Sequence, residues 1–196
     1  MYALGMDTSH AFLVICLMKD DKVLDAVQMF GRLRQSQLLV MEVRKMFDRQ
    51  NLAAKDIDAL VVTRGPGSYT GVRIAMTFAK VLASNAEKKL YTLSTLQLYA
   101  GLEDCYSIID ARAKRVYVGR YKDGKPLMED TIYTNDKMKE TVSDGTKVVG
   151  DLHLFGREDA YGDLCRNFVL LRDQWTPVEN VDLLAPSYLK SNEEYL

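Results

Sequence analysis

The segment Arg64-Gly65-Pro66-Gly67-Ser68-Tyr69-Thr70-Gly71-Val72-Arg73 joins two secondary-structure elements of different kinds. The apolar residues 59–62 before it are typical of a buried strand, and residues 69 to about 86 after it have the pattern of a long helix. The Gly-Pro-Gly sequence can continue neither element, and Ser68 is a favourable N-cap for the helix. The segment therefore predicts a tight strand-to-helix turn, a common connection in α/β folds.

A glycine-rich turn at the start of a helix is also a candidate anion-binding site. The first N–H groups of a helix lack partners and lie at the positive end of its dipole. The residues that an anion would contact here are Arg64, Gly65, Gly67, Ser68, Thr70 and Arg73. The residue pattern favours a purely structural turn and leaves an anion contact open.

The spacing excludes the best-known phosphate and nucleophile motifs. A P-loop would need a lysine directly after Gly71, where this chain has Val72. The dinucleotide fingerprint would need its third glycine three residues after Gly67, and Gly71 comes four residues later. A nucleophile elbow around Ser68 would need a glycine where Thr70 stands. No catalytic motif is therefore centred on this turn.

Small side chains recur along one line of the predicted helix. They occupy every fourth position, at Gly71, Ala75, Ala79 and Ala83. Such a ridge lets another helix approach closely. The alternative is an ordinary buried helix packed on its own sheet, for which Val72, Met76 and Leu82 are suitable. Because both faces carry residues that need cover, we expect the helix to lie between its own sheet and another body, such as a second chain.

The composition sets broad limits on function. The chain has 196 residues, a net charge of −1, three scattered cysteines and two histidines. This length allows one domain or two small ones. A nearly neutral chain has no global basic field for nucleic acid, and the cysteines are too few for a disulfide framework. Without a signal peptide or an apolar run of about 20 residues, we expect a soluble cytoplasmic protein that contacts no membrane.

The order of predicted elements repeats. Strands are expected at 2–6, 11–18, 23–30, 59–62 and 90–93, with helices at 34–50, 69–86 and 94–102. Shifting the sequence by 103 residues aligns Asp110 with Asp7 and opens a second, similar cycle near residue 105. A helix at 135–142 and a strand at 146–150 continue it. We therefore predict a duplicated α/β fold with mixed sheets, a lobe at 1–102 and a smaller lobe at 103–196.

The two aspartates at the ends of the first strands are candidate remnants of a nucleotide cleft. Asp7 and Asp110 could each contribute to a magnesium–phosphate complex between lobes. Neither is followed by a glycine that would let the backbone approach a phosphate. A structural role at the strand end is the favoured interpretation, and no metal site or catalytic residue is predicted.

Motifs along the whole chain resemble those of the bacterial TsaB (YeaZ) family of tRNA threonylcarbamoyladenosine biosynthesis proteins. The run from Arg64 to Ile74 is similar to the family signature. The resemblance extends to Met6-Asp7-Thr8-Ser9, Leu93-Ser94-Thr95-Leu96, Ile109-Asp110-Ala111-Arg112 with Val116-Tyr117, and Pro186-Ser187-Tyr188-Leu189-Lys190. These motifs stand in order from residue 6 to residue 190.

The resemblance implies an actin-like/HSP70-like (ASKHA, RNase H-like) duplicated fold without catalysis of its own. It implies pairing with the catalytic subunit TsaD, addition of the ATPase TsaE, and contact with tRNA through the complex. No cofactor is expected on this chain alone, since ATP and metal are expected on the partner subunits. The family docks, or forms homodimers, through its first two long helices. The docking residues expected here are Leu38, Leu39, Glu42, Met46, Tyr69, Gly71, Val72, Ala75, Ala79 and Ala83.

Two departures from the family pattern matter. Many relatives have His-Ser-Glu at the start of the first helix, where this chain has Gln35-Ser36-Gln37. Residues 152–182 are short and weakly patterned, which puts a tRNA contact by the second lobe in doubt. Two other hypotheses stay open: a small-molecule kinase of actin-like fold with Asp7 as metal ligand, and a peptidase. No motif supports the peptidase hypothesis, because the sequence shows neither His-Glu-x-x-His nor a nucleophile–base arrangement.

Overall fold

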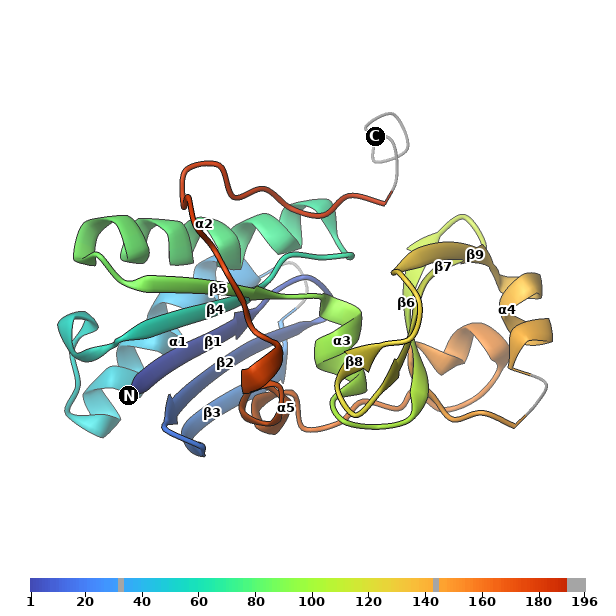
Figure 1. Cartoon of the computed structure of the whole chain (residues 1–196), viewed down its shortest axis with the longest axis horizontal. Helices are drawn as coiled ribbons and strands as arrows, with labels where there is room; N and C mark the ends of the chain where they lie inside the picture. Colours follow the sequence, from blue (N-terminus) through green and yellow to red (C-terminus); the bar gives the residue numbers. More distant parts are fainter. Residues whose placement is uncertain (32–33, 143–144, 190–196) are drawn as a thin grey trace.

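The computed structural model describes residues 1–31, 34–142 and 145–189, which form two lobes, each built on one sheet (Figure 1). The first sheet has the strand order β11-β5-β4-β1-β2-β3. Its strands are β1 (Tyr2–Asp7), β2 (Phe12–Lys19), β3 (Lys22–Phe30), β4 (Ala59–Thr63), β5 (Lys89–Leu93) and β11 (Thr176–Pro177). The first three strands form an antiparallel meander, and β1, β4 and β5 run parallel.

Both faces of the first sheet are covered by helices. Helices α1 (Gln35–Gln50) and α2 (Tyr69–Ala86) pack on one face, where they bury Leu4, Ile15 and Leu60. The other face lies under α3 (Thr95–Ala100) and α5 (Leu164–Leu170). Successive strand residues point to opposite faces, so a sheet covered on both sides needs unbroken apolar runs. This explains why 59–62 and 12–18 are apolar throughout.

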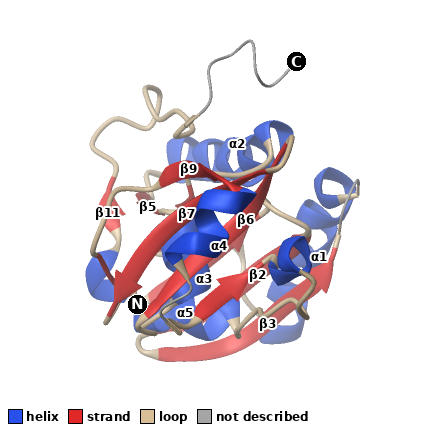
Figure 2. Ribbon diagram, turned by 90° about the vertical axis from the view of Figure 1, so that its right-hand side faces the viewer, coloured by secondary structure: helices blue, strands red, loops and turns tan. Residues whose placement is uncertain are grey.

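The second lobe repeats the first on a smaller scale. Its sheet has the order β10-β6-β7-β8, with β9 also paired to β7. The strands are β6 (Cys105–Arg112), β7 (Arg115–Lys122), β8 (Lys125–Pro126), β9 (Thr131–Thr134) and β10 (Val148–Gly150). Helix α4 (Asn135–Thr141) lies against this sheet, as Figure 2 shows. Its Met138 is buried in the core with residues of β6 and β7. Short 3₁₀ turns lie at η1 (Ala54–Asp56), η2 (Leu152–Phe155) and η3 (Arg172–Gln174).

The duplication predicted from the 103-residue shift matches the strand pairing. In each lobe an antiparallel hairpin, β1–β2 or β6–β7, is followed later by a strand parallel to its first member, β4 or β10. Asp7 pairs with Val14, whereas Asp110 pairs with Val116, so the second hairpin is one residue shorter. The helices and strands expected before residue 150 are confirmed to within a few residues.

The predicted boundary of the second lobe is wrong for the last part of the chain. Helix α5 packs against β2 and β3, and β11 pairs with the edge strand β5 of the first sheet. Phe168 and Trp175 lie in the core beneath that sheet. The chain therefore leaves the first lobe after α3 and returns to it after the second sheet. None of the helices in the described part of the chain combines the length and the apolar character that crossing a membrane requires.

Candidate functional site

Two regions of the structure are candidates for function: a cavity between the lobes and a groove between α1 and α2. Residues of the glycine turn and of the start of α2 line both of them. The cavity has a volume of about 770 Å³ and is lined by the strand-end loops of both lobes, the start of α1 and the start of α2. The groove has a volume of about 570 Å³ and lies on the outer side of the two helices.

The glycines of the turn let the first strand-end loop lie directly against it. A Cβ at Gly67 would collide with the carbonyl oxygen of Ser9, and one at Gly71 would collide with that of Thr8. The Ser68 N–H donates to the Ser9 carbonyl at 2.7 Å, and the Ser68 hydroxyl caps the helix by accepting from the Gly71 N–H. The predicted N-cap is confirmed. Close packing against the first strand-end loop thus accounts for Gly67 and Gly71. Part of the donor capacity of the turn is already used within the chain.

Thr8 is inserted into the hydrogen-bond ladder of α2. Its hydroxyl donates to the Gly71 carbonyl at 2.7 Å and accepts from the Ala75 N–H at 3.0 Å. A regular helix would join that carbonyl and that N–H directly. The buried side chain therefore ties the end of β1 to the first turn of α2.

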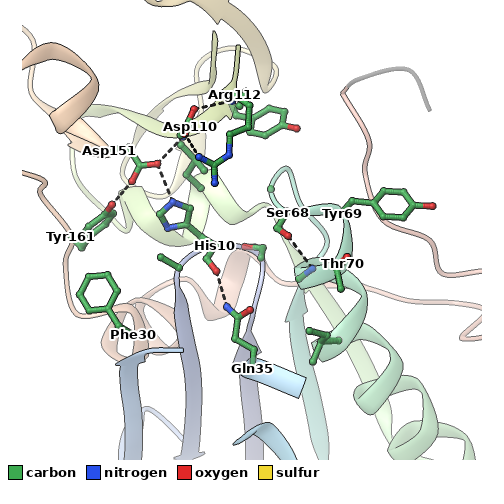
Figure 3. A pocket seen from close by; sticks show the side chains of 18 of the residues that line it. His10, Phe30, Gln35, Ser68, Tyr69, Thr70, Asp110, Arg112, Asp151 and Tyr161 are labelled. Carbon is green, nitrogen blue, oxygen red and sulfur yellow. Dashed lines mark hydrogen bonds and ion pairs between the residues drawn. The ribbon is translucent and has the colours of Figure 1, made fainter. Parts of the chain in front are cut away.

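A carboxylate at the base of the cavity joins the two lobes. The side chain of Asp151, which follows β10, is 2 % exposed. His10 contacts it through Nε2 at 2.9 Å, the Asp110 N–H donates to it at 2.7 Å, and the Tyr161 hydroxyl donates to its other oxygen (Figure 3). Burial opposes ionisation of Asp151, but the contact with His10 and the other donors outweigh it and lower its pKa.

Gln35 holds the first loop from the opposite side. Its Nε2 donates to the carbonyls of His10 at 2.6 Å and Phe12 at 2.8 Å. Both partners are acceptors, so the amide orientation is fixed. Gln35 thus orders the loop beside the start of α1, as Figure 3 shows.

Asp7 does not lie in the cavity. Its side chain is fully buried, and its Oδ1 accepts from the Ser9 N–H at 2.9 Å and from the Thr63 hydroxyl at 2.5 Å. The neighbouring Tyr99 hydroxyl is also buried, and burial together with the charge of Asp7 raises the pKa of Tyr99. Asp110, in contrast, lines the cavity, where it pairs with Arg112 at 2.9 Å. The two predicted cleft remnants are therefore not brought together.

The cavity contains no evident nucleophile–base pair. Neither His10 nor His153 has a hydroxyl or thiol partner among the residues that the structure describes. His153 contacts Asp159 at 2.8 Å, and together with Asp151 these residues have donor atoms close enough for a cation. Both oxygens of Asp151 are already bonded, however. Among the described residues, the cavity therefore offers hydrogen bonds and the contacts of Arg112 with Asp110 and of His153 with Asp159.

Most of the predicted docking residues are buried in the chain's own core. Seven are affected: Leu39, Met46, Gly71, Val72, Ala75, Ala79 and Ala83. The alanine ridge faces β1 and β4, because small side chains let the helix backbone lie close to the sheet. The prediction that this ridge is a free surface is wrong. Leu38, Glu42 and Tyr69 are partly exposed.

The open apolar surface lies beside the ridge, in the groove between α1 and α2. Val40 is 56 % exposed and Val81 is 53 % exposed, and both line the groove with the partly buried Ile74 and Phe78. These residues were missed because the alanine spacing drew attention to the adjacent face. The spacing of 74, 78 and 81 at one helical face was the signal available in the sequence. We call the surface formed by Val40, Ile74, Phe78 and Val81 the α1–α2 groove.

Comparisons with known proteins agree with this architecture. Residues 33–150 match the family model described as TsaD, tRNA N6-adenosine threonylcarbamoyltransferase. The tRNA threonylcarbamoyladenosine biosynthesis protein TsaB of Bacillus subtilis is 32% identical over 137 residues, which are 67% of this chain and 60% of that protein. TsaB of Escherichia coli is 33% identical over 129 residues, which are 62% of this chain and 55% of that protein. The aligned part thus spans less than two thirds of the length of these relatives.

Solved structures show the same fold. YeaZ from Pseudomonas aeruginosa superposes with a TM-score of 0.77 at 23% identity and covers 96% of this chain and 99% of its own. A second Pseudomonas aeruginosa structure, titled as similar to peptidase YEAZ, gives 0.79 at 22% identity with the same coverage. The two lobes thus have the duplicated actin-like (ASKHA) fold. With this fold and these matches, the chain belongs to the TsaB (YeaZ) family.

Proposed function

We propose that this chain is a non-catalytic subunit in the biosynthesis of N6-threonylcarbamoyladenosine on tRNA, and that it docks a TsaD-type catalytic subunit through the α1–α2 groove. The observation that carries the proposal is the groove itself. Exposed Val40 and Val81 flank Ile74 and Phe78 on a face that no other described part of the chain covers. Contiguous exposed apolar surface of this kind is typical of protein–protein contacts.

The partner is argued from the family match. Residues 33–150 of this chain, which include α1 and α2, match the model of the TsaD family. A TsaD-type subunit therefore shares this part of the fold and would carry its own equivalent helix pair. Two related helix pairs can pack about a pseudo-twofold axis, as equivalent surfaces do in symmetric dimers. A homodimer of this chain would use the same surface, so the two assemblies compete.

The state of the cavity supports a role without catalysis. The side chain of Asp7 is fully buried outside the cavity lining, and its Oδ1 is bonded to the Ser9 N–H and the Thr63 hydroxyl, so a metal ion in the cavity could reach it only after a rearrangement of the strand end. Neither strand-end loop contains a glycine. Both features disfavour the kinase hypothesis. The contacts that the described residues give His10 and His153 are with Asp151 and Asp159 and not with a hydroxyl or thiol, which disfavours the peptidase hypothesis. ATP and metal would then bind on the partner subunits, with a TsaE-type ATPase joining the pair and tRNA reaching it through the complex.

The test is pairing with the TsaD subunit of the same organism, followed by light scattering and titration calorimetry. Val81→Glu places a charge in the groove and should abolish pairing while leaving the fold intact, since the residue is exposed. Leu127→Glu is the matched control, because Leu127 is 57 % exposed and lies on the second lobe away from α1 and α2. The control should pair like the unmodified chain.

The outcomes separate the alternatives. Unchanged pairing by Val81→Glu would refute the groove as docking surface. Loss of self-association alone, with TsaD-type pairing retained, would assign the groove to a homodimer. Formation of the modified nucleoside by the isolated chain, supplied with tRNA and threonylcarbamoyl-adenylate, would refute the non-catalytic role.

A further inference from the structure

The segment after β11 runs back along α2 as a strap. We call residues 178–189 the C-terminal strap; Figure 1 shows it in red, passing from the sheet edge toward α2. Lys80 of α2 donates to the strap carbonyls of Asp182 at 2.9 Å and Leu184 at 3.1 Å. Farther along, the Ser187 N–H donates to the Arg64 carbonyl at 2.6 Å. The strap is therefore fixed to both the helix and the glycine turn.

The strap ends its described course on an arginine of α2. Arg73 donates from Nε to the Tyr188 hydroxyl at 2.8 Å. Its guanidinium carbon lies 3.9 Å from the centroid of the Tyr69 ring and 5.7 Å from that of Tyr188. The two rings are stacked, with centroids 5.1 Å apart and an interplanar angle of 21°. Both distances from the guanidinium are within the range of a cation–π contact, so the side chain is held in one place.

Among the described residues, this arrangement pairs the charge of Arg73 with no carboxylate. Arg73 is exposed, and no acidic group among the described residues forms an ion pair with it. Within the described part of the chain, Nε is the Arg73 nitrogen that forms a hydrogen bond, so the terminal nitrogens have donors to offer a partner. Arg73 and Tyr69 also line the α1–α2 groove, which places this ordered cation at the edge of its apolar surface. Arginine and tyrosine at the edge of an apolar patch are the residue types that dominate protein interfaces.

We propose that Arg73, held by Tyr69 and by Tyr188 of the strap, binds a carboxylate of the protein that docks in the α1–α2 groove. The inference rests on the proposed function and adds the chemistry of the partner: an aspartate or glutamate beside an apolar helix face. A guanidinium already fixed by stacking loses little conformational freedom when a planar carboxylate binds its two terminal nitrogens. The strap would thereby make the docking surface depend on a segment far from it in sequence.

A protein carboxylate fits better than an RNA phosphate. Phosphate contacts usually come from several cations that follow a nucleic-acid backbone. Beside Arg73, the Lys80 ammonium group is already engaged by two strap carbonyls. The neighbouring groove residues Ile74, Phe78 and Val81 are apolar. An ordered guanidinium at the margin of an apolar surface therefore suits a protein partner.

The test measures the affinity of the TsaD subunit for full-length variants at low and at high salt. Arg73→Gln should weaken binding about tenfold at 0.1 M salt and reduce its salt dependence, since one close charge pair is removed. Arg73→Lys keeps the charge but not the planar fork and should recover only part of the affinity. Tyr188→Phe removes only the hydroxyl that fixes Nε and should cause a smaller loss. Arg166→Gln makes the same charge change on α5, across the sheet, and should bind normally.

Each result bears on one of the two proposals. If the unmodified chain does not bind the TsaD subunit, both fail. If Val81→Glu blocks binding but Arg73→Gln binds like the unmodified chain with the same salt dependence, the groove stands and the role of Arg73 is overturned. If Arg73→Gln leaves this pairing unchanged and instead weakens binding of tRNA to the complex, the carboxylate proposal is also overturned. Thermal melts of every variant confirm that a loss of binding is not a loss of folding.

Discussion

Two loops at equivalent strand ends of the duplicated fold have opposite structures. Residues 8–11, after β1, are buried or half-buried, and side chains and carbonyls of Thr8, Ser9 and His10 bond to α1, α2 and α3. Residues 112–114, at the end of β6, form an exposed turn in which Arg112, Ala113 and Lys114 all have positive φ, of 64°, 51° and 56°. The first loop is thus a junction of the core, and the second is a tight hairpin turn at the surface.

The difference shows that the two strand-end carboxylates have different structural roles. In the first lobe the strand-end carboxylate of Asp7 has become part of the core. In the second lobe Asp110 pairs with its own turn through Arg112. The loops still meet, because His10 and the Asp110 N–H bond to the same oxygen of Asp151. The cleft therefore survives as a fixed joint between lobes.

The largest effect is expected from removing the first strand-end carboxylate. Asp7→Ala leaves the buried Ser9 N–H and Thr63 hydroxyl without their acceptor and should lower the free energy of unfolding by about 3 kcal/mol. Asp110→Ala removes an exposed ion pair and should lower it by less than about 1 kcal/mol. Urea unfolding followed by circular dichroism compares the two. An equal decrease in the free energy of unfolding for both variants would contradict the difference between the two strand ends.

A smaller loss is expected at the contact between the first loop and α2. Thr8→Val keeps the shape of the side chain but removes the hydroxyl between Gly71 and Ala75, and should destabilise the chain by about 2 kcal/mol. The residue aligned with Thr8 in the second lobe is Ala111, which is also buried, so Ala111→Ser is the comparison. If Thr8→Val unfolds at the same urea concentration as the unmodified chain, the hydroxyl is not a structural tie.

The joint between the loops should respond to acid. The pKa of Asp151 is lowered in the folded chain, so its contribution to stability is complete above the unfolded value near 4 and is lost as pH falls through the folded pKa. Asp151→Asn should remove this acid-side loss. Asp130, between the hydroxyls of Ser94 and Tyr121, has a raised pKa because of burial. Its contribution therefore has the opposite sign, and stability falls as pH rises through its folded pKa.

Unfolding measured between pH 3 and pH 7 distinguishes these two carboxylates. The stability difference between Asp151→Asn and the unmodified chain should shrink toward pH 3. The difference for Asp130→Asn should favour the variant increasingly as pH rises. Parallel pH profiles for all three proteins would contradict both assignments.

The smallest effect, a gain, is expected in the second loop. Lys114→Gly relieves a left-handed backbone in a two-residue hairpin turn and should stabilise the chain by about 1 kcal/mol. Ala11→Gly, in the first loop where φ is not positive, should instead cause a slight loss from backbone entropy. Thermal unfolding of the two variants gives the sign of each change. The same sign for both would contradict the conformational difference between the loops.

The sequence predicts much of the fold because the relevant signals are local. The apolar runs 59–62 and 12–18 indicate buried strands, and the Gly-Pro-Gly turn with Ser68 marks the start of α2. Helix α5 was not predicted, because its apolar pattern is short. The helix packs on β2 and β3, which lie nearly 150 residues earlier in the sequence. The cavity network was also missed, since His10, Asp151 and Tyr161 share no spacing that a sequence pattern could reveal.

The error at α2 has a physical cause. Small residues at every fourth position allow close approach by either a helix or a sheet, and the sequence does not say which body approaches. In the structure β1 and β4 fill that role, and Ala75 and Ala79 are buried there. A tryptophan at Ala79 would therefore disrupt the core instead of blocking only an interface. The residues that remain open, Val40 and Val81, belong to the adjacent stripe.

The return of α5 and β11 to the first sheet has a consequence for synthesis on the ribosome. Strands β1 to β5 emerge early, but the helix that shields one side of them, with Phe168 and Trp175, is translated only after the entire second lobe. Helix α3 follows β5 directly and can cover part of that side, but the part beneath Phe168 and Trp175 stays uncovered while about 60 further residues are made, a period of several seconds at ordinary elongation rates. During this interval we expect chaperones to bind mainly to β2 and β4, on the face of the sheet that Phe168 and Trp175 later cover.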